Sequence, residues 1–155
     1  MEQTGEYKEI VTIDVGVNGG LAYQKSDGTI LLKKITNDYV QNSDILFSAV
    51  GNQTLENISI YVEHQSLRKP DILSGRWFNI HKLCIDYNMW LNIAMCLGGE
   101  PQSLKPQEWQ SIFFVKGTTY KDKKKRLKEI ATKLFPKEKV TLWNCDALLM
   151  LYYKN

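Results

Sequence analysis

The chain contains few of the residues that are typical of secreted, zinc-binding or membrane proteins. Its three cysteines, Cys84, Cys96 and Cys145, are an odd number whose spacing matches no zinc-binding pattern. Two histidines are too few for a histidine-rich metal site. No apolar run reaches the about 20 residues that a transmembrane helix needs, and the polar, acidic segment 1–6 does not resemble a signal peptide. We therefore expect reduced thiols, no membrane partner and a cytoplasmic location.

What is present suits a folded globular protein. The chain has 155 residues, 43% hydrophobic and 24% charged, with no internal repeat and no low-complexity tract. This length suffices for a sizeable core, and no linker is long enough to separate two units. We expect one domain that spans residues 1–155.

The overall charge of +3 is unevenly distributed. Segment 116–139 has ten Lys or Arg against three Asp or Glu, whereas the rest of the chain has ten against fourteen. A basic block on an otherwise acidic body favours a polyanionic partner such as nucleic acid. The alternative is a solvated helix face that only aids solubility.

Segment 10–22 contains the first candidate functional residue. A β-branched run ends at Asp14, glycines follow, and a second apolar run begins at Leu21. This pattern predicts a buried strand, a tight turn and an antiparallel partner. A carboxylate on a central strand is costly to bury unpaired. Asp14 therefore either accepts N–H groups of its own turn or binds a cation.

Hydrophobic periodicity and turn residues predict an α/β fold with a five-stranded mixed sheet flanked by helices. An antiparallel meander of three strands opens the sheet, and two parallel strands complete it. The expected strands are 8–14, 21–24, 29–35, 58–62 ending on Glu63, and a short one at 101–104. The expected helices are 38–50, 74–97, one starting at 105, 121–135 and one from 144 to 153, with a loop at 64–71 and a flexible connection at 116–119.

The predicted helix 74–97 is apolar on more than one side. Trp77, Ile80 and Trp90 belong to the main apolar stripe, while Phe78 and Ile85 lie off it. Such a helix packs on its own domain and on something else. A homodimer interface is our preferred explanation, and deep burial inside a monomer is the alternative.

Three carboxylates occupy comparable places on the predicted elements. Asp14 and Glu63 each end a buried strand, and Asp146 lies in the first turn of the last helix, where it can also be only a partner of the helix dipole. If the first and fourth strands are neighbours, these acids converge. Hard divalent metals such as Mg²⁺ bind such oxygen ligands. Two ions about 4 Å apart can activate water for phosphodiester hydrolysis.

These features resemble those of a known family. The ordered set is similar to RuvC-type Holliday junction resolvases of the RNase H-like superfamily, especially the phage-borne branch. The matching segments are 13–22 (IDVGVNGGLA), 61–63 (YVE), 105–109 (KPQEW), 121–124 (KDKK), 134–136 (LFP) and 145–149 (CDALL).

The resemblance implies an RNase H-like nuclease that resolves four-way junctions by paired nicks, with forks as a further candidate substrate. It implies a dimer through helix 74–97, Mg²⁺ as cofactor with Mn²⁺ as a substitute, and a host bacterial cytoplasm if the chain is phage-encoded. Asp14, Glu63 and Asp146 match the metal-binding acids, and Lys121 matches a basic residue near the scissile phosphate. Leu67 and Arg68 fall where the family inserts side chains at the junction. The expected DNA-binding residues are Arg68, Lys69, Lys105, Lys116, Lys123, Lys124, Lys125 and Arg126.

The chain also departs from the family pattern. Val15 replaces a proline, and Trp143 stands where the family often has a further acid. Asn144 could supply a neutral oxygen ligand instead, with weaker binding of the second metal. A non-catalytic protein that binds branched DNA is therefore an alternative function. An actin-like or sugar-kinase fold also places glycines after a strand aspartate, but it needs two domains, for which the chain is too short.

Overall fold

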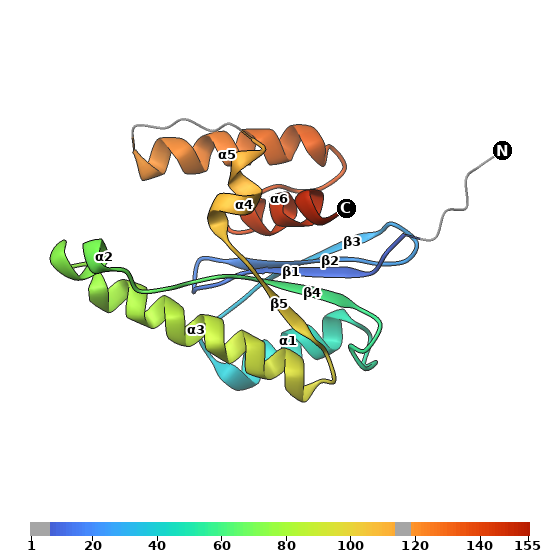
Figure 1. Ribbon diagram of the computed structural model, residues 1–155. Helices are drawn as coiled ribbons and strands as arrows, with labels where there is room; N and C mark the ends of the chain where they lie inside the picture. The colour runs from blue at the N-terminus through green and yellow to red at the C-terminus, as the bar shows by residue number, and fades with distance from the viewer. Residues whose placement is uncertain (1–6, 114–118) are drawn as a thin grey trace.

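A central sheet separates two groups of helices in the computed structural model, which describes residues 7–113 and 119–155 (Figure 1). The strand order is β3-β2-β1-β4-β5. Strands β1, β2 and β3 pair antiparallel, whereas β4 runs parallel to β1 and β5 runs parallel to β4. The strands are β1 (Ile10–Asp14), β2 (Gly20–Gln24), β3 (Ile30–Lys34), β4 (Ser59–Glu63) and β5 (Pro101–Leu104). The predicted five-stranded mixed sheet is confirmed.

Helices cover both faces of the sheet. Helices α1 and α3 lie on one side, and α4, α5 and α6 lie on the other (Figure 1). Their bounds are α1 (Tyr39–Ala49), α2 (Lys69–Leu73), α3 (Trp77–Cys96), α4 (Pro106–Ser111), α5 (Tyr120–Leu134) and α6 (Cys145–Lys154). Within the described residues, no helix is both long and apolar enough to cross a membrane.

Helix α2 corrects the prediction of a loop at 64–71. Pro70 lies in its first turn, where proline's missing N–H leaves no hydrogen bond unmade. The Asp71 carboxylate accepts the Arg68 N–H at 3.1 Å and thereby caps the helix start. A helix of five residues has too little apolar periodicity to be found from sequence. The predicted connection 116–119 lies mostly outside the described residues.

The alternation of side chains along β1 divides the core in two. Val11 and Ile13 belong to the cluster beneath α1 and α3, whereas Ile10 belongs to the cluster around α6. Because successive strand residues point to opposite faces, Asp14 points to the same side as Ile10 and Thr12. The same argument places Glu63 on the α6 side, two residues after Tyr61.

The glycine turn after Asp14 is tight for steric reasons. Gly16 has a φ of 104°, a conformation that favours glycine, and its carbonyl accepts the Gly19 N–H at 2.9 Å. Gly20 pairs with Asp14 across the strands. A Cβ at Gly20 would lie 2.7 Å from the Trp143 carbonyl oxygen, so only glycine allows this close approach to the segment before α6.

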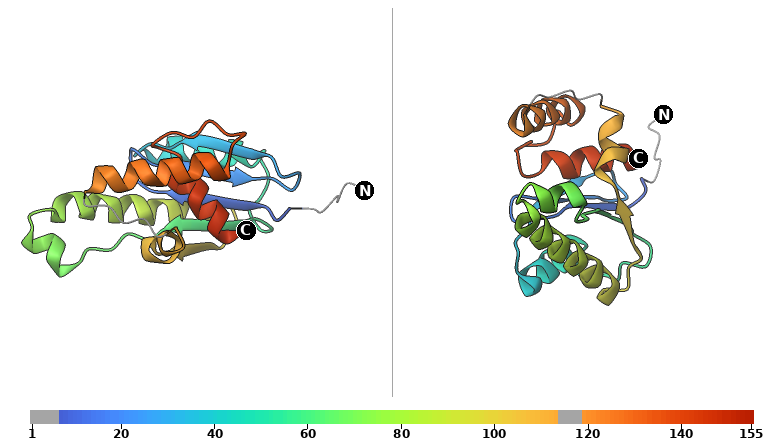
Figure 2. Two further views of the ribbon diagram at one scale, coloured as in Figure 1. Left: turned by 90° about the horizontal axis from the view of Figure 1, so that it is seen from above. Right: turned by 60° about the vertical axis from the view of Figure 1, so that its left-hand side comes forward.

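Helix α3 is buried along only part of its surface. Trp90 is fully buried, as predicted for a packing residue. Trp77, which was also predicted to pack, is 49% exposed, and Phe78 and Ile85 are exposed as well. In the view from above, α2 and the start of α3 extend beyond the sheet (Figure 2). The helix therefore presents an apolar face that the described residues of its own chain do not cover.

One buried hydrogen bond joins the sheet directly to α6. The Thr12 hydroxyl donates to the Ala147 carbonyl oxygen at 2.7 Å, and Thr12 is fully buried. Because Thr12 precedes Asp14 by two residues and Ala147 follows Asp146, this bond fixes the spacing between the two aspartates.

We predict that Thr12→Val lowers the free energy of unfolding by about 1 kcal/mol, since valine keeps the shape but loses the hydrogen bond. Urea denaturation measures the change. The matched control is Thr132→Val, because the exposed Thr132 hydroxyl also donates to a helix carbonyl, that of Lys128. The control should change stability by less than about 0.5 kcal/mol. Equal effects of the two substitutions would contradict the prediction.

Candidate active site

Three buried carboxylates converge on the α6 side of the sheet. Asp14 ends β1, Glu63 ends the adjacent parallel strand β4, and Asp146 lies in the first turn of α6. These three residues are only 6–8% exposed. Burial raises the pKa of Asp14 well above its usual value, and the negative charges of Glu63 and Asp146 raise it further. The folded chain thus holds three acids within electrostatic range of one another.

Glu63 is held by hydrogen bonds at both of its oxygens. The Trp109 indole N–H donates to Oε1 at 3.2 Å, and the Gln65 amide donates to Oε2 at 3.1 Å. Burial, followed by the charge of Asp146, raises the pKa of Glu63 to about 7, while hydrogen bonds from Asp14 and Trp109 oppose the rise. Sequence analysis gave Trp109 and Gln65 no role at this site.

Lys124 supplies the positive charge at this site. Its Nζ lies 2.5 Å from Asp146 Oδ2 and 3.8 Å from Asp14 Oδ2. Burial alone would lower the pKa of Lys124, but the two aspartates outweigh it and the pKa is raised. Lys124 therefore stays charged and lies between two of the acids.

This position differs from the sequence prediction, which placed Lys121 near the scissile phosphate. Lys121 is exposed on α5, and Lys124 was predicted only to contact DNA. The helical periodicity of α5 could have indicated this position of Lys124. Lys124 precedes the buried Leu127 by three residues and the buried Ala131 by seven, so it lies on the inward face of α5.

Asn144 has a structural function in this arrangement. Its Oδ1 accepts the Thr141 N–H at 2.7 Å, and its Nδ2 donates to the Lys139 carbonyl oxygen at 3.0 Å. The side chain thus shapes the turn that leads into α6, and its predicted use as a metal ligand gains no support from this geometry. Cys145 lies beside the acids, because its Sγ is 3.3 Å from Asp146 Oδ1 and burial raises its pKa to about 12.

The predicted DNA-binding residues divide into two groups. Lys123 contacts Gln110 Oε1, so it is engaged within the chain like Lys124. Lys116 lies outside the described residues. The exposed members are Arg68, Lys69, Lys105, Lys125 and Arg126. Tyr120 was not predicted, yet it is 81% exposed and lies one turn before Lys124 on α5.

A divalent cation suits the chemistry of these donors. Within residues 7–113 and 119–155, no three His, Cys, Asp or Glu side chains stand in a geometry that could hold a metal ion. The donor set nevertheless fits a hard cation, because carboxylate oxygens are its preferred ligands and three buried acids repel one another without one. Asp14, Glu63 and Asp146 are the residues that would hold it.

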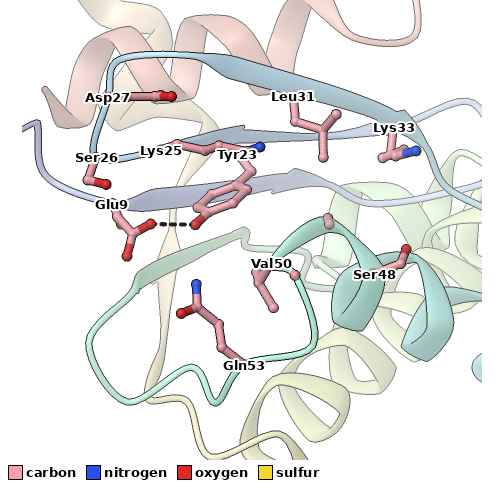
Figure 3. Close-up of a pocket in the computed structure, with 12 residues that line it drawn as sticks. Glu9, Tyr23, Lys25, Ser26, Asp27, Leu31, Lys33, Ser48, Val50 and Gln53 are labelled. Carbon is pink, nitrogen blue, oxygen red and sulfur yellow. Dashed lines mark hydrogen bonds between the residues drawn. The ribbon is translucent and has the colours of Figure 1, made fainter.

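A separate cavity of about 500 Å³ lies elsewhere on the sheet (Figure 3). Glu9, Tyr23, Lys33 and Gln53 are among its lining residues, and the Tyr23 hydroxyl donates to Glu9 Oε1 at 2.5 Å. Glu9 precedes the start of β1, whereas Asp14 ends it. The cavity is therefore not part of the acidic site.

Comparisons with known proteins agree with this arrangement at the level of fold. No protein-family model matches the sequence, and no curated protein sequence matches it. Among solved structures, the chain is similar to the RuvC structure of Thermus thermophilus, with 13% identity and a TM-score of 0.50. The match covers 94% of this chain and 92% of that one. The fold of the chain is thus RuvC-like, with a five-stranded mixed sheet flanked by helices.

We predict that Asp14→Asn makes the metal-free protein more stable at neutral pH. The raised pKa of Asp14 means that its ionised form opposes folding, and asparagine removes that charge. Urea denaturation in a chelator measures the gain. The exposed Asp44 on α1 provides the control Asp44→Asn, which should change little. Added Mg²⁺ should stabilise the wild-type protein more than Asp14→Asn, and a less stable Asp14→Asn variant would contradict the prediction.

Proposed function

We propose that the chain is a divalent-metal-dependent endonuclease that resolves four-way DNA junctions by paired nicks, with other branched DNA as a further candidate substrate. The observation that carries the proposal is the convergence of Asp14, Glu63 and Asp146 beside Lys124, on the same side of a RuvC-like fold. Burial and neighbouring acids raise the pKa of Asp14 and of Glu63, and groups with such shifts cluster at functional sites.

The chain's own residues have distinct roles in this proposal. Asp14, Glu63 and Asp146 would hold Mg²⁺, or Mn²⁺ in its place. Bound metal ions of this kind activate water and stabilise the leaving oxygen of a phosphodiester. Lys124, which already pairs with two of the acids, would place a positive charge where negative charge develops on the phosphate.

The exposed basic residues fit a DNA backbone. Lys105, Lys125 and Arg126 are exposed on or before α4 and α5, the helices that lie on the same side of the sheet as the acids. Phosphate contacts of this type give affinity that falls steeply with salt, and they do not depend on base sequence. Selection of substrates by their shape, rather than by their sequence, follows from such contacts.

Paired nicks require two active sites, and a dimer formed through the exposed side of α3 would supply both. Trp77, Phe78 and Ile85 together form an apolar face on a helix whose opposite side packs on the sheet. A second copy of the chain is the proposed occupant of this face. The assignment to a phage-borne branch and to a host cytoplasm also remains a proposal.

A second candidate function is binding of branched DNA without cleavage. Trp143 lies against Gly20 in place of a further acid, and both polar ends of the Asn144 side chain bind backbone. The site therefore has three acids rather than four, and two of them are already paired with Lys124. These observations favour the binding-only candidate over other non-enzymatic functions.

The deciding experiment incubates purified protein with an end-labelled four-way junction and Mg²⁺. We expect nicks at symmetric positions in two opposed strands. Asp14→Asn should abolish them while junction binding, followed by gel shift, is retained. Exposed Asp44→Asn is the control and should still cut. Binding by the wild-type protein without any nick would refute the nuclease and support the binding-only function.

Lys124→Met tests the role of the lysine between the acids. We expect a loss of about 100-fold in the single-turnover nicking rate, because a fixed positive charge near the phosphate is removed. Lys128→Met, on the same helix but outside the site, should stay within about threefold of the wild type. Lys121→Met should lose less activity than Lys124→Met. A larger loss of activity in Lys121→Met than in Lys124→Met would instead support the predicted role of Lys121 near the scissile phosphate.

A further inference from the structure

We propose that Trp109 is a positioning residue that fixes the orientation of the Glu63 carboxylate as a metal ligand. The proposal rests on the proposed function, because it concerns how one acid of that site is held. It assigns a role at the site to an aromatic side chain that would otherwise be counted only as core.

The path of the chain explains why Trp109 reaches Glu63. In the pairing of β4 with β5, Glu63 lies opposite Leu104. Helix α4 begins two residues later at Pro106 and turns back over the end of the sheet. Its single buried residue, Trp109, thereby places the indole Nε1 at 3.2 Å from Glu63 Oε1.

Packing holds the indole ring in this position. Trp109 is fully buried in the cluster around α6 and contacts the Phe113 ring at a centroid distance of 6.4 Å. The ring therefore cannot turn away from Glu63 without disturbing the core. By contrast, the second donor to Glu63, Gln65, lies on a partly exposed loop. Of the two donors, Trp109 is the rigid one.

Hydrogen bonds to a ligating side chain are known to tune metal affinity. They restrict the orientation of the ligand, and their loss typically weakens binding by 10- to 100-fold. An indole N–H has one donor and no acceptor, so it can support a carboxylate in one geometry only. Trp109 is thus suited to hold Oε1 in place while leaving the remaining lone pairs of Glu63 for a cation.

The chain provides a matched control in Trp90. This residue is also fully buried, but it lies on α3, in the core on the opposite face of the sheet. Within the described part of the chain, its Nε1 has no hydrogen-bond partner. Tryptophan to phenylalanine at either position removes the same atoms from a core, yet only Trp109→Phe removes a donor to Glu63.

The test measures Mn²⁺ binding by isothermal titration calorimetry in the wild type, Trp109→Phe and Trp90→Phe, with circular dichroism to check folding. We expect Trp109→Phe to bind Mn²⁺ at least about tenfold more weakly than Trp90→Phe, which should stay within about threefold of the wild type. In nicking assays, the Mg²⁺ concentration at half-maximal rate should rise for Trp109→Phe, and the maximal rate should largely recover at high Mg²⁺.

Equal Mn²⁺ affinities of the two variants, in a protein whose wild type binds Mn²⁺, would overturn this assignment alone. A wild type that binds no Mn²⁺ would overturn the proposed metal-dependent function together with it. If Trp109→Phe does not fold, benzothienylalanine at position 109 keeps the bicyclic ring and replaces the N–H with sulfur. Wild-type Mn²⁺ affinity in that protein would likewise refute the role of the N–H.

Discussion

The mutual repulsion of three buried carboxylates is the constraint on which the rest of this site depends. Asp14, Glu63 and Asp146 each lose most of their contact with water, and burial together with the neighbouring charges raises the pKa of the first two. A fold tolerates such groups only if donors or cations surround them. Lys124 and Trp109 meet part of that need, and both come from helices that cover the α6 side of the sheet.

Sheet topology brings these acids together without any local signal between them. Parallel pairing of β1 with β4 puts the ends of both strands at one edge, and the two-residue period puts Asp14 and Glu63 on one face. Helix α6 packs on that face and is tied to it by Thr12. Gly20, in turn, lets the segment before α6 approach β2 closely. The strand pairing, the Thr12 hydrogen bond and the close approach at Gly20 therefore stabilise the fold and also position the acids.

Much of this arrangement could be predicted from the sequence because it follows from periodicity. The strand runs that end on Asp14 and Glu63 depend on patterns that a single segment displays. The pairing of the first strand with the fourth was only a condition of the sequence argument, and the parallel pairing of β1 with β4 meets that condition. Contacts between distant segments could not be predicted in this way. Trp109 follows Glu63 by 46 residues, and its link to Glu63 depends on how α4 turns after β5. Lys124 was predicted only to contact DNA, because it lies within a run of lysines and their charge density does not distinguish a residue that faces the interior.

The charge balance of the site bears on how many cations it can hold. Three carboxylates and one ammonium group leave a net charge of at most −2, which one divalent cation neutralises. A second divalent cation would then bring excess positive charge, which a phosphate that arrives with it would offset and which departure of Lys124 from Asp146 would only reduce. A fourth acid at the position of Trp143 would reduce this excess, but Trp143 and Asn144 carry no charge. The sequence-based expectation of a weaker second metal thus gains a physical reason: Lys124 already supplies part of the positive charge.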